Sequence, residues 1–308
     1  MGAPDDERGA GLSDRIEDGV LAAAIGAARQ LPYDRRVPFM GALTSHLVAP
    51  VAGYRKRIRD NLALVCPELP PAEVARLCRA VPDNLGRSLI EIFSPQDLLR
   101  RAEHTPLTGP GFEVIEAARA AGRPAIIVTG HIGNYEIARA ALQARGYSVG
   151  ALYKPMRNRY FNARYLRAMS HIDTPLFARS RDGLARMIRF LRGGGLLCIV
   201  VDQRIARGAP LRFFGHEART ALSAAELALR FGAPLVPGYA IRRPDGLNFD
   251  VSFEAPVARD TPEAMTQALN DSLEVQVRAH MDQWLWTHRR WKLPRRQSAG
   301  RAEPRIRP

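Results

Sequence analysis

From residue 112 onward, short apolar runs alternate with amphipathic helical patterns, and this alternation constrains the fold more than any other feature. The runs have the length of buried strands, and a helical pattern separates each from the next. Buried strands joined by helices predict an α/β fold with a mixed, largely parallel sheet that helices cover on both faces. The apolar runs are residues 124–129, 147–153, 196–201 and 235–241, and we expect a further strand, at an edge, over residues 248–253.

The organisation of the chain changes near residue 104. Residues 13–104 have helical patterns interrupted by prolines, whereas residues 105–294 carry the strand and helix alternation. We therefore predict a helical N-terminal region followed by an α/β domain. Residues 1–12 are predicted to be disordered, and the Arg- and Pro-rich residues 295–308 are predicted to form a mobile basic tail.

The helical N-terminal region contains two apolar segments, at residues 19–28 and 37–54. Both are too short or too interrupted to span a bilayer, but cations such as Arg35, Arg55 and Lys56 flank the second. Cations beside an apolar segment favour attachment to an anionic membrane surface. The alternative is that these are amphipathic helices packed on the protein's own core.

The formal net charge of +14 favours polyanionic partners, which include an anionic bilayer, an acidic protein and nucleic acid. Nucleic acid is the weaker interpretation, because the arginines are spread over the chain without a nucleic-acid-binding motif. Cys66, Cys78 and Cys198 are far apart and form no CxxC pair, which indicates a reducing compartment. We expect no metal site.

The segment Thr129–Glu136 is the strongest candidate for chemistry. His131 lies in a turn between Gly130 and Gly133, directly after a strand, and Glu136 lies in the first turn of the following helix. The carboxyl ends of strands are where open α/β sheets bind ligands. Since Glu136 can fold back toward the imidazole, we predict that His131 acts as a general base and Glu136 as its carboxylate partner. A hydrogen-bonded structural histidine is the alternative.

Further polar residues follow strand ends at the same edge, where their cations and amides suit phosphate or carboxylate binding. A solvated basic loop and a helix or turn cap are the alternatives for these positions. Two phenylalanines, Phe213 and Phe214, can either line an acyl-chain channel or fill the core. We predict these substrate-binding residues: Gly130, Asn134, Lys154, Arg157, Asn158, Asp202, Gln203, Arg204 and Thr220.

The segment 283–292 combines three tryptophans with Arg and Lys. Such a mixture is typical of a membrane interface or of nucleic-acid stacking.

Four ordered segments, GHIGNYE, LYKPMRNRYFN, VDQR…RFFG…ART and QWLWTHRRWK, resemble the bacterial lipid A biosynthesis late acyltransferases. These lauroyl and myristoyl transferases are similar to the lysophospholipid acyltransferases and to enzymes that acylate phosphatidylinositol mannosides. The resemblance implies a glycerolipid acyltransferase-like fold and transfer of an acyl group from acyl carrier protein, or coenzyme A, to a hydroxyl of a membrane glycolipid. It also implies His131 as base, Glu136 as its partner and no cofactor beyond the acyl donor.

The same resemblance implies a place of action at the cytoplasmic face of the bacterial inner membrane. Because we find no transmembrane segment, we expect peripheral or monotopic attachment. Two alternatives stay open. One is an acyltransferase for another membrane lipid or an amine, and the other is a non-enzymatic basic protein that binds anionic lipid.

Overall fold

A computed structural model describes residues 11–291, so most of the segment predicted to be disordered and all of the predicted mobile tail lie outside the described residues. Up to Glu103 the described chain is helical, and the predicted boundary at residue 104 falls between the last of these helices and the first strand. The helices are α1 (Leu12–Ala28), α2 (Tyr33–Leu43), the π-helical turn η1 (Thr44–Val48), α3 (Ala49–Val51), α4 (Tyr54–Val65), α5 (Pro71–Ile92) and α6 (Pro95–Glu103).

The rest of the described chain alternates between strands and helices, as the sequence predicts. The strands are β1 (Leu107–Thr108), β2 (Ala125–Thr129), β3 (Val149–Tyr153), β4 (Leu176–Ala178), β5 (Leu196–Val200), β6 (Ala209–Phe213), β7 (His216–Thr220), β8 (Leu235–Arg242) and β9 (Phe249–Phe253). The helices are α7 (Pro110–Ala120), α8 (Glu136–Gln143), α9 (Arg159–Ile172), α10 (Arg181–Arg192), α11 (Ser223–Phe231) and α12 (Pro262–Ala279).

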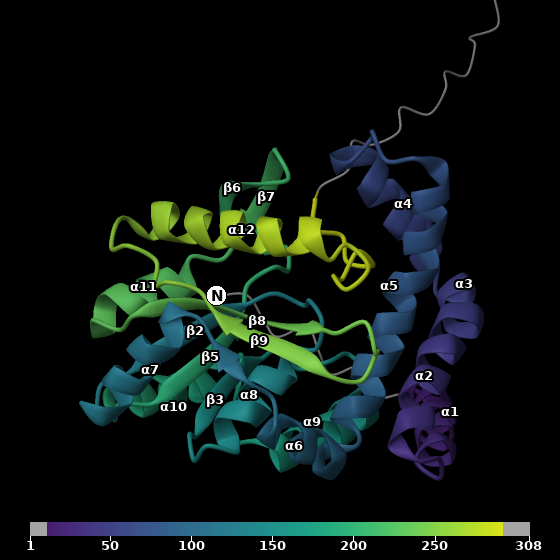
Figure 1. Ribbon diagram of the computed structural model, residues 1–308, viewed down its shortest axis with the longest axis horizontal. Helices are drawn as coiled ribbons and strands as arrows, with labels where there is room; N and C mark the ends of the chain where they lie inside the picture. Colours follow the sequence, from purple (N-terminus) through teal and green to yellow (C-terminus); the bar gives the residue numbers. More distant parts are fainter. Residues whose placement is uncertain (1–10, 292–308) are drawn as a thin grey trace, which may run out of the picture.

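Seven strands form one mixed, mostly parallel sheet, which confirms the predicted α/β fold (Figure 1). The strand order is β1-β9-β8-β2-β5-β3-β4, and β9 runs antiparallel to β8. The expectation of an edge position for the strand near residue 250 is wrong, because the two-residue strand β1 pairs with the outer side of β9. The hairpin of β6 and β7 was not predicted from the sequence.

The central strands are buried along their whole length because helices cover both faces of the sheet. Ile127 contributes to a core with α7, α8 and α9, whereas its neighbours Ile126 and Val128 contribute to a second core with α10, α11 and α12. Successive side chains of a strand point to opposite faces, so one apolar run supplies both cores.

Helix α5 stands between the sheet and the first helices of the chain (Figure 1). Its C-terminal residues Ile90 and Ile92 belong to the same core as the sheet, and α2 and η1 pack on it from the other side. The N-terminal region therefore shares a hydrophobic core with the α/β part. Among residues 11–291, no helix is both long and apolar enough to cross a membrane.

Candidate active site

His131 lies at the carboxyl end of β2, and its carboxylate partner is Asp202. The Nδ1 atom of His131 is 2.7 Å from Oδ1 of Asp202, and the backbone N–H of His131 donates to Oδ2 of the same side chain at 2.7 Å. The parallel pairing of β2 with β5 explains the contact. Thr129 is in register with Val200, so the residues two positions beyond each strand end lie side by side.

The environment of Asp202 keeps its carboxylate ionised. Burial by itself would raise the pKa of Asp202, but the charge of His131 and the hydrogen bonds from His131 and Trp284 lower it to about 2. The indole Nε1 of Trp284 donates to Oδ2 at 2.8 Å. Because an ionised carboxylate only accepts, Nδ1 of His131 carries the hydrogen and Nε2 carries the lone pair.

Glycines allow this approach of the backbone to the carboxylate. A Cβ atom at position 130 would lie 2.6 Å from Cδ1 of Leu273 and 3.2 Å from Oδ2 of Asp202. Gly133 has a φ of +58°, and a Cβ there would lie 1.9 Å from the carbonyl oxygen of Ala240. The two glycines are therefore required by the packing of the turn.

The expected contact between Glu136 and His131 is wrong. Glu136 is buried, and its carboxylate is 2.5 Å from the guanidinium of Arg139, one turn further along α8. A buried carboxylate needs a cation close by, and positions three apart on a helix supply one. Glu136 thus stabilises the beginning of α8, and the structure brings Asp202, which the sequence analysis had placed among substrate-binding residues, to the histidine.

Asn134 is buried and holds the turn in place. Its Oδ1 accepts from the backbone N–H of Glu136 at 3.1 Å, and its Nδ2 donates to Glu91 of α5 at 2.8 Å. Glu91 also binds both terminal nitrogens of Arg242, so a buried ion pair lies behind the turn. The predicted role of Asn134 in substrate binding is not supported by this geometry, because its side chain is buried and its oxygen and nitrogen both bond inside the protein.

Three residues on one face of α5 form hydrogen bonds with the turn that carries His131. Asn84 Nδ2 and Ser88 Oγ both donate to the carbonyl oxygen of Gly133, at 3.1 and 2.9 Å, and Glu91 completes the set. Their spacing places them on the same face of the helix. These three residues were not predicted from the sequence, since single polar residues in a helical pattern carry no signal of their distant partners.

A Glu91→Gln variant is expected to lose about 3 kcal/mol of unfolding free energy, because it leaves the charge of Arg242 buried without its counter-charge. Denaturant unfolding of the purified protein measures the loss. The matched control on the same helix is Glu73→Gln, whose ion pair with Arg76 is partly exposed and should contribute below about 1 kcal/mol. Equal losses of unfolding free energy in the two variants would show that the buried ion pair stabilises the fold no more than the exposed one.

The other predicted binding residues fall into two groups. Lys154 and Arg157 are exposed after β3, and Gln203 and Arg204 are partly exposed directly after Asp202, so these four stay candidates for substrate contacts. Two others have structural partners: Asn158 caps α9 through its side-chain oxygen, and buried Thr220 accepts from Arg290 at 2.6 Å.

The tryptophans of the C-terminal segment are buried, so the expectation that their side chains form a membrane or nucleic-acid interface is wrong. Trp284, Trp286 and Trp291 pack together with Phe213 and Phe214 in a third core cluster. The two phenylalanines therefore fill the core. Arg290 lies in the same region, and burial lowers its pKa to about 10.

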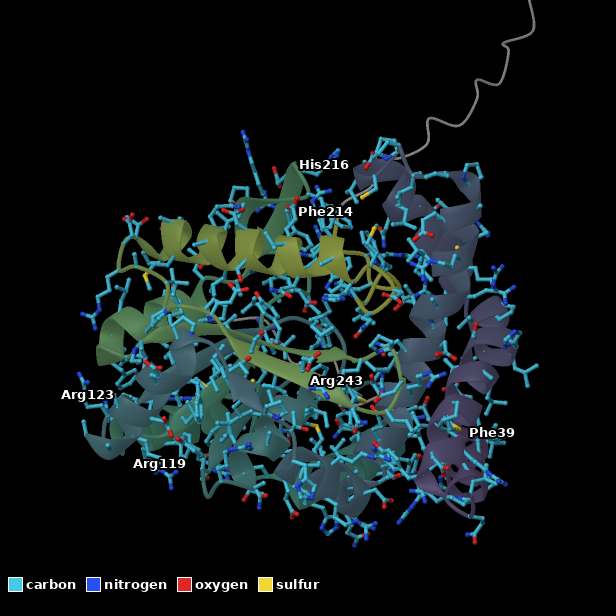
Figure 2. All side chains as sticks on the ribbon, viewed as in Figure 1. Phe39, Arg119, Arg123, Phe214, His216 and Arg243 are labelled. Carbon is cyan, nitrogen blue, oxygen red and sulfur yellow. The ribbon has the colours of Figure 1, made fainter. Side chains whose placement is uncertain are left out.

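Two cavities in the described part lie at the amino ends of the strands, opposite the end of the sheet that carries His131. One of about 460 Å³ lies at the beginning of β8, and one of about 200 Å³ lies at the beginning of β5. Arg123 lines both and is seen at the far left of the molecule in Figure 2. They are therefore separated from His131 by the length of the strands.

Comparison with known proteins gives this site its context. Residues 18–293 match the family model described as bacterial lipid A biosynthesis acyltransferase. The chain belongs to this family. It is therefore an acyltransferase, and His131 lies in the motif by which the sequence resembles the family.

The names of relatives of this acyltransferase specify different acceptor lipids. A phosphatidylinositol mannoside acyltransferase of Mycobacterium tuberculosis (strain CDC 1551 / Oshkosh) is 26% identical over 78% of each chain. Another, from Mycolicibacterium smegmatis, is 27% identical over 91% of this chain and 93% of its own. The lipid A biosynthesis lauroyltransferase of Escherichia coli K12 is 26% identical over 85% of this chain and 87% of its own.

Proposed function

We propose that this acyltransferase moves a fatty acyl group from an acyl thioester, on acyl carrier protein or coenzyme A, to a hydroxyl of a membrane glycolipid such as a lipid A precursor. The observation that carries the proposal is the pair of His131 and Asp202. It leaves a lone pair on Nε2 of a histidine that is 22% exposed, at the edge of the sheet where α/β proteins bind ligands.

The reaction follows from this arrangement. Nε2 of His131 takes the proton of the acceptor hydroxyl while its oxygen attacks the carbonyl carbon of the thioester. The tetrahedral intermediate collapses, the carbon–sulfur bond breaks, and the imidazolium returns the proton to the departing thiolate. Asp202 fixes the tautomer and stabilises the imidazolium between the two steps. The route uses no cofactor beyond the acyl donor, and no acyl-enzyme forms.

The charge of the protein supports the same substrates. A net charge of +14 attracts both an acidic carrier protein and an anionic bilayer, and it accelerates encounter with either. Lys154, Arg157, Gln203 and Arg204 surround the same edge of the sheet and are the side chains we assign to the phosphate or carrier groups of the substrates. We therefore place the enzyme at the cytoplasmic face of the inner membrane, where the leaflet is anionic.

The first helices carry apolar side chains that face outward, and we assign them to membrane attachment. Leu12, Ile16 and Val20 lie four residues apart along α1 and are 57–74% exposed, while Val51 of α3 is 91% exposed. Phe39 projects at the outer edge of the same helices (Figure 2). Exposed apolar side chains on N-terminal helices that also carry the exposed cations Arg35 and Lys56 fit the interface of an anionic bilayer.

Replacing Ile16 and Val51 together by aspartate is expected to weaken binding to phosphatidylglycerol vesicles by at least ~10-fold, because each large apolar side chain contributes about 1.5–3 kcal/mol on burial. Vesicle co-sedimentation measures this loss. Val275→Asp is the control, since Val275 is 64% exposed on α12 outside the N-terminal helices. Unchanged binding of the double variant would place the membrane contact elsewhere.

The decisive test of the function is mass spectrometry of the lipids of a strain that lacks the protein. Loss of one secondary acyl chain from lipid A, restored by the wild-type gene and not by His131→Ala, supports the proposal. If lipid A is unchanged and another lipid of the strain loses an acyl chain, that lipid is the acceptor. Anionic-lipid binding without any acyl transfer by the purified protein would favour a purely lipid-binding role.

A further inference from the structure

His288 lies in a turn that contacts the segments of both His131 and Asp202, although it is far away in the sequence. The backbone N–H of Leu285 donates to the carbonyl oxygen of His131 at 3.1 Å, and His288 closes the turn that follows by donating to Leu285. The backbone N–H of Arg204, two residues after Asp202, donates to Nε2 of His288 at 3.1 Å. The His288 ring thus connects the chain segment beside His131 to the segment after Asp202.

The contact with Arg204 determines which nitrogen of His288 carries hydrogen. A backbone N–H can only donate, so Nε2 accepts and the neutral ring carries its hydrogen on Nδ1. Burial lowers the pKa of His288, and the neighbouring charge of Asp202 only partly opposes this effect. His288 is therefore held neutral, with a hydrogen-bond donor at Nδ1.

This donor is fixed in place. The carbonyl oxygen of His288 accepts from Asn61 of α4 at 2.9 Å and from the backbone N–H of Arg290 at 3.1 Å. The ring itself is half-buried, and no group within residues 11–291 accepts a hydrogen bond from its Nδ1. A rigid donor without an acceptor, in the turn that follows the backbone contact with His131, is what stabilisation of a developing negative charge requires.

The two histidines have complementary arrangements. His131 donates from Nδ1 to Asp202 and offers a lone pair at Nε2, whereas His288 accepts at Nε2 and offers a hydrogen at Nδ1. One can remove a proton from the acceptor hydroxyl, and the other can donate a hydrogen bond without losing its proton. In other enzymes a neutral imidazole donates a hydrogen bond of this kind to a substrate carbonyl oxygen.

We propose that His288 is a second catalytic histidine, whose Nδ1 hydrogen binds the thioester carbonyl oxygen and stabilises the negative charge that forms on it during acyl transfer. The proposal rests on the proposed function. It involves no proton transfer by His288, since the charge returns to the carbonyl when the thiolate departs.

Two substitutions separate the two nitrogens of the ring. In His288→Gln the side-chain oxygen can still accept from Arg204, but the donor at the Nδ1 position is lost. In His288→Asn the amide nitrogen takes the Nδ1 position, but the acceptor for Arg204 is lost. We expect kcat to fall by about 10²–10³-fold in His288→Gln, with little change in KM, and by less than about 10-fold in His288→Asn.

His216→Gln is the matched control, because this exposed histidine lies at the tip of the hairpin of β6 and β7, at the top of the molecule in Figure 2. Activity is measured with lauroyl-acyl carrier protein or lauroyl-coenzyme A, whichever supports turnover of the wild type. A larger loss in His288→Asn than in His288→Gln, equal losses, or no loss in either overturns the proposal. The first pattern would leave His288 only the task of holding the segment of Arg204.

A second measurement does not depend on turnover. The infrared carbonyl stretch of the same bound thioester, without acceptor, should lie at lower frequency in the wild type than in His288→Gln. Equal frequencies count against the contact. If the wild type transfers no acyl group to any lipid, the proposed function and this inference fail together, whereas an active wild type with an equally active His288→Gln overturns this inference alone.

Discussion

Substitution of His131 by alanine is expected to lower kcat by about 10²–10⁴-fold, because the reaction then lacks the base that removes the hydroxyl proton. The fold should be kept, since the imidazole is partly exposed and the turn is held by contacts of Gly133 and Asn134. Steady-state transfer of an acyl group from the thioester to the lipid measures the loss. Full activity of His131→Ala in folded protein would exclude the proposed mechanism.

An Asp202→Asn variant is expected to lose nearly as much activity as His131→Ala. The backbone N–H of His131 and the indole of Trp284 both donate to Oδ2, so the amide oxygen of asparagine must take that position. Its NH₂ group then faces Nδ1 of His131, which has to accept, and the imidazole hydrogen moves to Nε2. The base is lost through the wrong tautomer, an effect that costs about 10⁴-fold in serine proteases.

Two further variants make this test specific. The double variant of His131→Ala and Asp202→Asn should be no slower than His131→Ala alone, because both changes remove the same base. Glu136→Gln is the second, since it replaces the carboxylate that the sequence motif points to and that the structure pairs with Arg139. A loss in Glu136→Gln as large as that of Asp202→Asn, at equal stability, would return the partner role to Glu136.

Sequence patterns predicted those parts of the site whose residues are close together in the sequence. The strand that ends at Thr129, the glycine-flanked turn and the helix after it follow from residues that are adjacent in the sequence. The partner of His131 does not, because it depends on which strands become neighbours. Two strands were predicted with nearly correct ends, but only their parallel pairing in the sheet brings residues 131 and 202 together.

Composition alone could not separate a membrane interface from a core. Tryptophans interleaved with arginines suit either place. In the folded chain the indole of Trp284 reaches the buried Asp202, and Arg290 is buried against Thr220. Whether residues 283–292 lie in the core or at an interface depends on contacts between residues about 70 to 80 positions apart. The periodicity within this segment does not reveal such contacts.

The hydrogen bonds from α5 to the turn of His131 limit how far this enzyme can be truncated at its N-terminus. Its first helices pack on the side of α5 that faces away from the sheet, while Asn84, Ser88 and Glu91 hold the turn. Cutting the chain after α5 would remove the support of the turn together with the apolar helices. A detergent-free form for crystallisation is therefore better sought by polar substitutions on the outward side of α1 and α3 than by shortening the chain.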